Sequence, residues 1–440
     1  MRNVPITVAE AFRFWLKLGF ISFGGPAGQI AIMHQELVEK RRWISEARFL
    51  HALNYCMLLP GPEAQQLATY IGWLLHRTWG GLVSGMLFIL PSLLILIVLS
   101  YLYVAYGAVP AVAAFFFGIK PAVVAIVAFA AWRIGSRVIR NVPLAAIAIA
   151  AFLALFVFSV PFPLVIIGAA LTGWLGSRLF PASFAIPPRS ADLHASGPAV
   201  IDDEMPPPAH AKFTWMRVLS VLGIGAALWA GAMALLIQLQ GKAGTLTQMG
   251  VFFSKAALVT FGGAYAVLPY VTQGAVEQYG WLSAPQMIDG LALGETTPGP
   301  LIMVVTFVGY VGSWTHAAAQ GLSPAMAGLL GALVVTFFTF LPSFVFIFAG
   351  APLVEATRGQ KFFIAPLTAI TAAVAGVIVN LAMFFATHVF WPAGVRVAPD
   401  LVSIVIATGA AMALFVFRVG VIPVILVAGA LGIVIRLSGG

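Results

Sequence analysis

Two lysines lie inside apolar stretches of the sequence, where a charged side chain is unusual. Lys17 and Lys255 each stand about two helical turns before a Phe-Gly-Gly triplet. A lysine at the centre of a membrane helix costs roughly 2.5–3.5 kcal/mol on insertion scales, so it normally faces a cavity or a partner. Two such ammonium groups would suit a small, doubly charged anion. The alternative, strongest for Lys17 near the start of its segment, is that the ammonium group reaches the lipid headgroups.

A Pro-Gly-Pro triplet interrupts an apolar stretch in each half of the chain, at 60–62 and at 298–300. Where such a triplet breaks a helix, the next turn presents free N–H groups and the positive end of its dipole, which together favour an anion. The alternative is that glycine and proline only permit a kink or close helix packing. The residues expected in an anion site at these breaks are Gly61, Glu63, Ala64, Gln65, Thr297 and Gly299.

Ser22 and Thr260 occupy equivalent positions directly before the two Phe-Gly-Gly triplets. Their hydroxyl groups can donate hydrogen bonds to the oxygens of an anion, or they can bond back to a carbonyl of their own helix. The triplet glycines interrupt the backbone ladder, which a membrane tolerates only where protein or a watery cavity satisfies the freed groups. The same predicted site therefore includes Gly24, Gly25, Gly262 and Gly263.

Two acidic residues beside the Pro-Gly-Pro breaks have no acidic counterpart in the other half. Glu63 corresponds to Leu301, and Glu295 corresponds to Met57. An ionisable carboxyl group at membrane depth is a candidate proton carrier. It is equally well explained as a structural partner for a lysine, and both interpretations stay open.

The composition identifies the chain as a membrane protein. Of its 440 residues, 61% are hydrophobic and 8% are charged, whereas soluble proteins carry roughly 25% charged residues. Apolar runs close to the roughly 20 residues needed to cross a bilayer recur along the whole length. We ascribe the net charge of +9 to cytoplasmic loops, where Lys and Arg gather, and not to a nucleic-acid partner.

The residue types needed for several other kinds of chemistry are scarce. The chain has one cysteine, Cys56, and seven scattered histidines, which argues against a disulfide and against a soft-metal site. The sequence contains no hydrolytic triad, phosphate loop or dinucleotide fingerprint. We therefore expect no metal, no cofactor and no enzymatic activity, and transport would be driven by a gradient.

The two halves are copies of one another. Phe23-Gly24-Gly25 matches Phe261-Gly262-Gly263 at an offset of 238 residues, and the same offset aligns the two lysines and the two Pro-Gly-Pro triplets. Apolar helices matching by chance would not keep Gly, Pro and Lys together in one register, so the sequence contains a duplication. We expect one unit over 1–180 and a second over 250–440.

The segment between the units contains a polar stretch and one more apolar helix. Residues 181–212 are rich in proline and acidic side chains, a composition that predicts a flexible linker. Residues 213–239 predict an extra transmembrane helix. Because each unit has an even number of crossings, this single helix would turn the second unit upside down.

The distribution of basic residues agrees with inverted units. The loop after the first broken segment carries Lys40, Arg41 and Arg42, whereas the matching loop at 272–286 carries neither Lys nor Arg. The first of these loops would face the cytoplasm, as would the N-terminus and the linker. The predicted fold is thus an all-α polytopic membrane protein with about 13 segments, whose broken helices either cross or re-enter.

At these motifs the sequence resembles the chromate ion transporter family in its long, two-domain form. The motifs are Phe14-x-x-Lys17-Leu-Gly-Phe-x-Ser22-Phe-Gly-Gly-Pro26, Leu59-Pro-Gly-Pro-Glu63, Thr260-Phe-Gly-Gly-Ala-Tyr265 and Glu295-Thr-Thr-Pro-Gly-Pro300. The resemblance implies efflux of chromate across the bacterial inner membrane by two homologous halves of opposite orientation. Sulfate, which has the same shape and charge, is expected to compete.

The residues and the resemblance together predict a secondary carrier that exports chromate by alternating access around the broken helices. One alternative is a carrier or channel for sulfate or another small anion. A more distant alternative is a membrane-bound enzyme acting on chromate, for which Cys56 is the candidate. The expected partners are the oxyanion and membrane lipid, and a homo-oligomer is left open.

Overall fold

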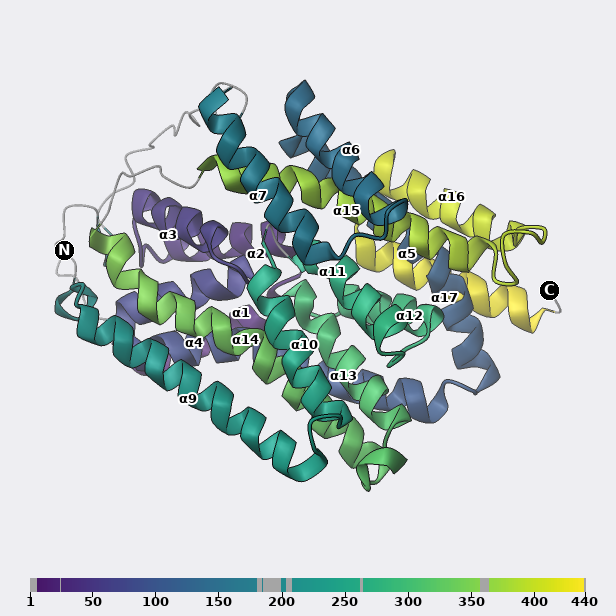
Figure 1. The fold of residues 1–440 in the computed structure, drawn as a ribbon, viewed down its shortest axis with the longest axis horizontal. Coiled ribbons are helices and arrows are strands. Elements are labelled where there is room, and N and C mark those ends of the chain that lie inside the picture. The colour runs from purple at the N-terminus through teal and green to yellow at the C-terminus, as the bar shows by residue number, and fades with distance from the viewer. Residues whose placement is uncertain are drawn as a thin grey trace.

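The computed structural model of this chain describes residues 6–23, 25–179, 184, 199–202, 208–261, 264–356 and 364–438. Within these ranges the chain is helical, with short connections (Figure 1), and one isolated parallel bridge joins Ile44 and Ile201. An apolar composition favours this outcome, because a helix satisfies its backbone N–H and C=O groups within one segment. The predicted all-α class is confirmed for these residues.

The helices of the first half are α1 (Val8–Ile21), α2 (Gly25–His34), the π-helix η1 (Gln35–Lys40), α3 (Glu46–Leu58), α4 (Glu63–Tyr106), α5 (Pro110–Val138), α6 (Val142–Phe156) and α7 (Phe162–Leu179). A short turn η2 (Ala209–Ala211) and the long helix α9 (Trp215–Gln240) follow. The second half contains α10 (Thr245–Val259), α11 (Ala264–Thr272), the π-helix η3 (Gln273–Gln278), α12 (Ala284–Thr296), η4 (Leu301–Met303), α13 (Val304–Thr315), η5 (Ala318–Gln320), α14 (Pro324–Ala356), α15 (Ile364–Phe390), α16 (Leu401–Phe415) and α17 (Val421–Leu437).

The order of helices in the first half returns in the second. The π-helices η1 and η3, and the helices α3 and α12, cover corresponding residues at the 238-residue offset. Ser45 and Ser283 cap the starts of α3 and α12 with their side chains, which satisfies first-turn amides in both copies. The helix between the halves, predicted over 213–239, is α9.

The helix α4 consists of two helices joined by a kink. His76 and Arg77 lie outside the helical region, and the φ of Arg77 is +57°. The two parts of α4 correspond to α13 and α14, which are separate in the second half. Each Pro-Gly-Pro triplet thus joins two short helices. A helix of 13 residues, such as α3 or α12, is about 20 Å long, which is less than the roughly 30 Å thickness of the hydrocarbon core.

Among the described residues, six helices are long and apolar enough to cross a membrane, namely α4, α5, α7, α9, the Pro324–Pro352 part of α14, and the Ala365–Phe390 part of α15. Four further apolar helices in this part of the chain are shorter. This confirms a polytopic membrane protein. The inverted orientation of the halves and the total of about 13 segments stay predictions.

The two halves pack on one another reciprocally. The helix α5 packs on α15, α16 and α17, while its counterpart α15 packs on α5, α6 and α7. Such an exchange of equivalent contacts is what a two-fold relation produces. Glycine permits the closest approach, because a Cβ atom at Gly118 of α5 would collide with the backbone of α17 at Ala428 and Gly432. Small residues at helix contacts are typical of membrane bundles.

Part of the segment predicted as a linker lies against the first half. The Ile201 amide donates to the Trp43 carbonyl at 3.0 Å, and the Ser45 amide donates to the Ile201 carbonyl at 3.0 Å. The loop after the first broken segment and residues 199–202 therefore lie together. Apart from Phe184, residues 181–198 fall outside the part of the chain that the structure describes. The helix α9 packs on α10 and α14 at one edge of the molecule (Figure 1).

Candidate functional site

The broken segments of one half are hydrogen-bonded to those of the other. The Gly61 amide donates to the Thr260 carbonyl at 2.8 Å, and the Gly299 amide donates to the Ser22 carbonyl at 2.8 Å. These are equivalent pairs, since Gly61 corresponds to Gly299 and Ser22 to Thr260. Both glycines have positive φ, +126° and +96°, in a region that side chains with a Cβ rarely adopt.

A serine of the opposite half covers each of these glycines. A Cβ atom at Gly61 would collide with Ser343 Oγ, and a Cβ atom at Gly299 would lie 2.9 Å from the Cβ atom of Ser92. Ser92 and Ser343 are themselves equivalent, in the Leu-Pro-Ser motifs of α4 and α14. We call the two contact regions the break junctions. The first contains Ser22, Gln29, Ser92 and Gly299, and the second contains Thr260, Gly61, Gln66 and Ser343.

Each break junction contains buried polar atoms without a partner. The hydroxyl oxygens of Ser92 and Ser343 and the Oε1 atoms of Gln29 and Gln66 are buried and make no hydrogen bond. The amide groups of the two glutamines do bond: Gln29 Nε2 donates to the Ser22 carbonyl at 3.3 Å, and Gln66 Nε2 to the Pro60 carbonyl at 2.8 Å. Unpaired buried polar atoms are rare in native proteins, and each requires an explanation such as a ligand or water.

The hydroxyl groups predicted from the sequence bond back to their own helices. Ser22 Oγ donates to the Leu18 carbonyl at 2.6 Å, and Thr260 Oγ1 donates to the Ala256 carbonyl at 2.5 Å. Of the two open interpretations, the structure shows back-bonding. Thr297 Oγ1 likewise donates to the carbonyl of Gly294, at 3.0 Å. The hydroxyl donors left for a ligand in the junctions are therefore those of Ser92 and Ser343, which the sequence reasoning had not selected.

The helix start after the first Pro-Gly-Pro triplet is buried and has no capping side chain. Pro62 precedes α4 and makes no side-chain cap, so the first amides of the helix have no partner within it. Those amides belong to Glu63, Ala64 and Gln65, which are all buried. Gln65 Nε2 donates to Thr69 Oγ1 at 3.0 Å, while its Oε1 atom is unpaired. After the second triplet the chain instead forms the short 3-10 turn η4.

Lys17 and Lys255 lie at the surface of the molecule. Among the described residues, neither lysine forms an ion pair or hydrogen bond with a member of the break junctions. Lys17 is within electrostatic range of Glu36 in η1. Of the triplet glycines, Gly25 has a φ of +69°; the other three, Gly24, Gly262 and Gly263, lie outside the described residues.

The two acidic residues at the breaks have different surroundings. Glu63 is 9% exposed and lies close to the buried Cys56. Glu295 accepts a hydrogen bond from the Tyr265 hydroxyl and is within electrostatic range of Arg133. A Cβ atom at Gly25 would lie 3.9 Å from the Arg133 guanidinium. Arg133 therefore lies near both one Phe-Gly-Gly break and Glu295.

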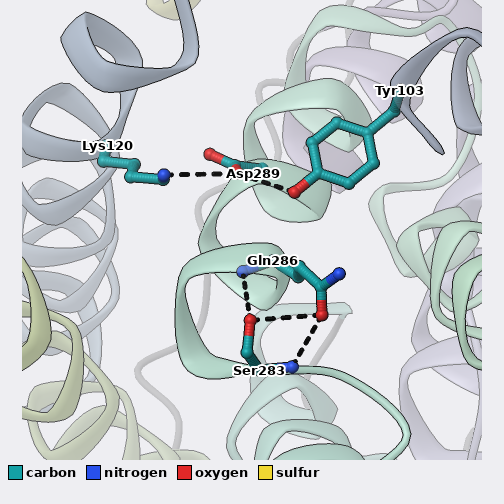
Figure 2. A network of polar contacts seen from close by, with 5 residues as sticks. All are labelled: Tyr103, Lys120, Ser283, Gln286 and Asp289. Atoms are coloured by element: carbon teal, nitrogen blue, oxygen red, sulfur yellow. Dashed lines mark hydrogen bonds and ion pairs between the residues drawn. The ribbon is translucent and has the colours of Figure 1, made fainter. Parts of the chain in front are cut away.

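A further acidic residue, which is buried, pairs with a lysine of the other half. Lys120 Nζ of α5 lies 3.5 Å from Asp289 Oδ2 of α12, and the Tyr103 hydroxyl of α4 donates to the same oxygen at 2.9 Å (Figure 2). These side chains line a cavity of about 410 Å³ together with Gln286 and Trp314. The sequence reasoning missed them. The available signal was a single Lys and a single Asp, each inside an otherwise uncharged stretch.

The arrangement suits the binding and passage of a small polar solute. In the part of the chain that the structure describes, no group of three or more His, Cys, Asp or Glu side chains could hold a metal ion. Polar groups instead converge where helices of both halves are broken, which is the usual place of substrate sites in transporters built from repeats.

A comparison with known protein families identifies the family of this chain. The family described as Chromate transporter matches residues 9–174 and again residues 247–433. This chain belongs to the chromate transporter family. Because one family description matches both halves, the match also supports the duplication, and membership makes the chain a transporter and not an enzyme.

Three curated members of the family are similar over most of their length. The Chromate transport protein of Cupriavidus metallidurans is 29% identical over 86% of this chain and 83% of its own length. The Chromate transport protein of Pseudomonas aeruginosa is 33% identical over 85% of this chain and 80% of its own length. The Probable chromate transport protein of Synechococcus elongatus is 28% identical over 85% of this chain and 84% of its own length. No solved structure matches the chain.

Proposed function

We propose that this chain is a secondary carrier that exports chromate from the bacterial cytoplasm, with sulfate as a competing ligand. Support for chromate comes from the family and from the names of the relatives. Support for a carrier comes from the reciprocal break junctions, because each half contributes backbone and hydroxyl groups to a region containing the broken segments of the other.

The observation that carries the proposal is the set of unpaired buried groups at the junctions. The Ser92 and Ser343 hydroxyls can donate to oxyanion oxygens, and so can the uncapped amides that begin α4. Preorganised donors of this kind bind a tetrahedral anion without further charge. Lys17 and Lys255 would add positive charge along the path, and Glu63 or Glu295 would carry protons if transport is proton-coupled.

The proposed orientation places the two halves upside down relative to one another in the inner membrane. The reciprocal packing of α5 and α15 supports a two-fold relation. The contact between residues 199–202 and the basic loop at 41–45 supports a common side for that loop and the linker. Basic loops favour the cytoplasm, so the linker would be cytoplasmic.

Uptake of chromate into everted membrane vesicles tests the proposal. We expect saturable uptake that excess sulfate inhibits and that the Ser92→Ala/Ser343→Ala variant reduces. Ser220→Ala is the matched control, because Ser220 is exposed on α9. No chromate uptake by well-energised vesicles containing the wild-type chain would contradict the assignment.

Counterflow distinguishes the proposed carrier from an anion channel built on the same site. With the membrane potential clamped at zero, vesicles preloaded with unlabelled sulfate should accumulate labelled chromate above its external concentration, which a channel cannot do. Loss of uptake in Lys17→Gln/Lys255→Gln would support a role of both lysines in the path. Full uptake would restrict the site to the break junctions.

A further inference from the structure

The Lys120–Asp289 pair joins the two halves at a cavity away from the Pro-Gly-Pro breaks. Lys120 belongs to α5 in the first half, and Asp289 belongs to α12 in the second half. Asp289 is 3% exposed, while Lys120 is 29% exposed and faces the cavity. The ion pair and the hydrogen bond from Tyr103 both involve Asp289 Oδ2, and Oδ1 is buried without a partner.

The cavity is large enough for a hydrated oxyanion. Its volume of about 410 Å³ is more than ten times the roughly 30 Å³ that a water molecule occupies in the liquid. Besides Lys120 and Asp289, its polar lining includes Tyr103, Gln286 and Thr315. Figure 2 shows the lysine, the carboxylate and the tyrosine in one row, with Gln286 one turn earlier on α12.

The charge of the cavity depends on one proton. With Asp289 ionised, the carboxylate neutralises the Lys120 ammonium group and would repel an anion. With Asp289 protonated, the ammonium group is left without its counter-charge, which favours binding of an anion.

The groups that face Asp289 are few. Of the elements packed against α12, α5 brings Lys120 and α4 brings Tyr103 to this carboxyl group. From η4, α13, α15 and α17, no titratable side chain of the described residues forms a hydrogen bond or ion pair with Asp289. Lys120 is therefore the main charged group that affects the protonation of Asp289.

We propose that Lys120 and Asp289 form a proton-gated oxyanion site, in which protonation of Asp289 releases Lys120 to bind a tetrahedral anion in the cavity. This rests on the proposed oxyanion transport and adds to it a coupling site distinct from Glu63 and Glu295. Asp289 corresponds to His51 in the first half, so the other half has no acidic equivalent. One side of the carrier would thus bind its anion together with a proton.

Sulfate binding to the purified full-length chain, measured by titration calorimetry at a series of pH values, tests this site. Sulfate stays a dianion throughout the range, so any pH dependence belongs to the protein. Because one proton is linked to binding, the wild-type dissociation constant should rise by up to about tenfold per pH unit once Asp289 ionises. Asp289→Asn should bind as tightly as wild type at low pH, without the pH dependence. Lys120→Gln should lose this binding, while Lys242→Gln, at an exposed connection before α10, should match wild type.

The Tyr103→Phe variant provides a second test that keeps the ion pair intact. Removing the hydrogen bond to the ionised carboxylate favours its protonated form. The midpoint of sulfate binding should therefore move to higher pH with an unchanged slope. An Asp289→Asn variant that retains the wild-type pH dependence would overturn the site, as would unaltered binding by Lys120→Gln.

Chromate flux in proteoliposomes separates failure of this site from failure of the proposed function. If the wild-type chain transports chromate but sulfate binding by Asp289→Asn keeps the wild-type pH dependence, oxyanion transport is supported and the proton-gated site is refuted. Absence of both flux and sulfate binding in the wild-type chain would overturn both.

Discussion

The Gly61 amide donates a 2.8 Å hydrogen bond to the Thr260 carbonyl, which belongs to the opposite half of the protein. The equivalent bond from Gly299 to Ser22 has the same length. Each Pro-Gly-Pro break is therefore completed by the residue that ends α1 or α10 in the other half. A movement that separates the halves at this level must break both bonds.

Replacing Gly61 by alanine should reduce both stability and transport. The residue has a φ of +126° and its Cβ atom would collide with Ser343 Oγ. A positive φ in a residue with a Cβ costs roughly 1–2 kcal/mol, and the collision adds to this. Thermal unfolding in detergent and vesicle uptake would measure the two effects. Gly223→Ala is the control, since a Cβ atom there meets nothing within 4 Å and the added helix propensity should leave stability equal or higher. A Gly61→Ala variant with wild-type melting temperature and uptake would contradict the assigned geometry.

Replacing Ser92 and Ser343 by alanine should separate function from stability. Their hydroxyl groups are buried and unpaired, so removing them does not break a hydrogen bond and can stabilise the fold by about 1 kcal/mol. Transport should fall because the oxyanion loses two donors. We expect an unchanged or raised melting temperature together with a raised KM for chromate uptake. A lowered melting temperature with normal uptake would show that the two hydroxyls are structural.

The Glu295→Gln variant tests the role of this carboxyl group in proton coupling. Glu295 is hydrogen-bonded to Tyr265 and lies near Arg133, so an amide keeps the shape but cannot exchange a proton. Uptake driven by an imposed pH gradient should be lost, while counterflow at equal pH on both sides should persist. The Tyr265→Phe variant, which keeps the carboxyl group, should retain the response to the gradient. Equal loss of both activities in Glu295→Gln would indicate a structural role.

The segment around His210 should detach from the first half on acidification. His210 Nε2 lies 3.0 Å from the Trp73 carbonyl, and burial lowers the pKa of the His210 imidazole. A lowered pKa means that the detached segment binds the proton more tightly, so docking is favoured above the ordinary histidine pKa of about 6.5 and weakens as the pH falls below it. Limited proteolysis of the segment before α9 should be faster at pH 5.5 than at pH 7.5. The His210→Gln variant should remove that difference, and pH-independent proteolysis of the wild-type chain would rule the mechanism out.

The repeat could be predicted from the sequence because short motifs within each half show it. Gly, Pro and Lys recur in one register, and the resulting elements correspond closely, down to the π-helices η1 and η3. The helix between the halves was also evident, since an apolar run of this length predicts a membrane helix on its own, and α9 (Trp215–Gln240) lies within two residues of the predicted bounds.

The contacts between the halves could not be predicted in the same way. No periodicity connects Gly61 to Thr260 or Lys120 to Asp289, because these pairs are far apart in sequence and depend on how whole helices pack. The two repeated lysines could be predicted as site residues because a charged side chain in an apolar run is unusual. The serines of the junctions could not be predicted, because a serine in a membrane helix is common and usually bonds back to its own helix.

The bonds from Gly61 to Thr260 and from Gly299 to Ser22 join main-chain atoms, and this has a consequence for how the duplicated halves evolve. Mutation of a side chain cannot delete a backbone amide or carbonyl, so the mutual recognition of the halves survives wide divergence as long as the two glycines remain. Each copy is then free to carry ionisable residues that the other copy lacks, as Asp289 and Glu295 occur in one copy and Glu63 in the other. A symmetric ancestor could in this way become a transporter that works in one direction, through changes confined to one half at a time.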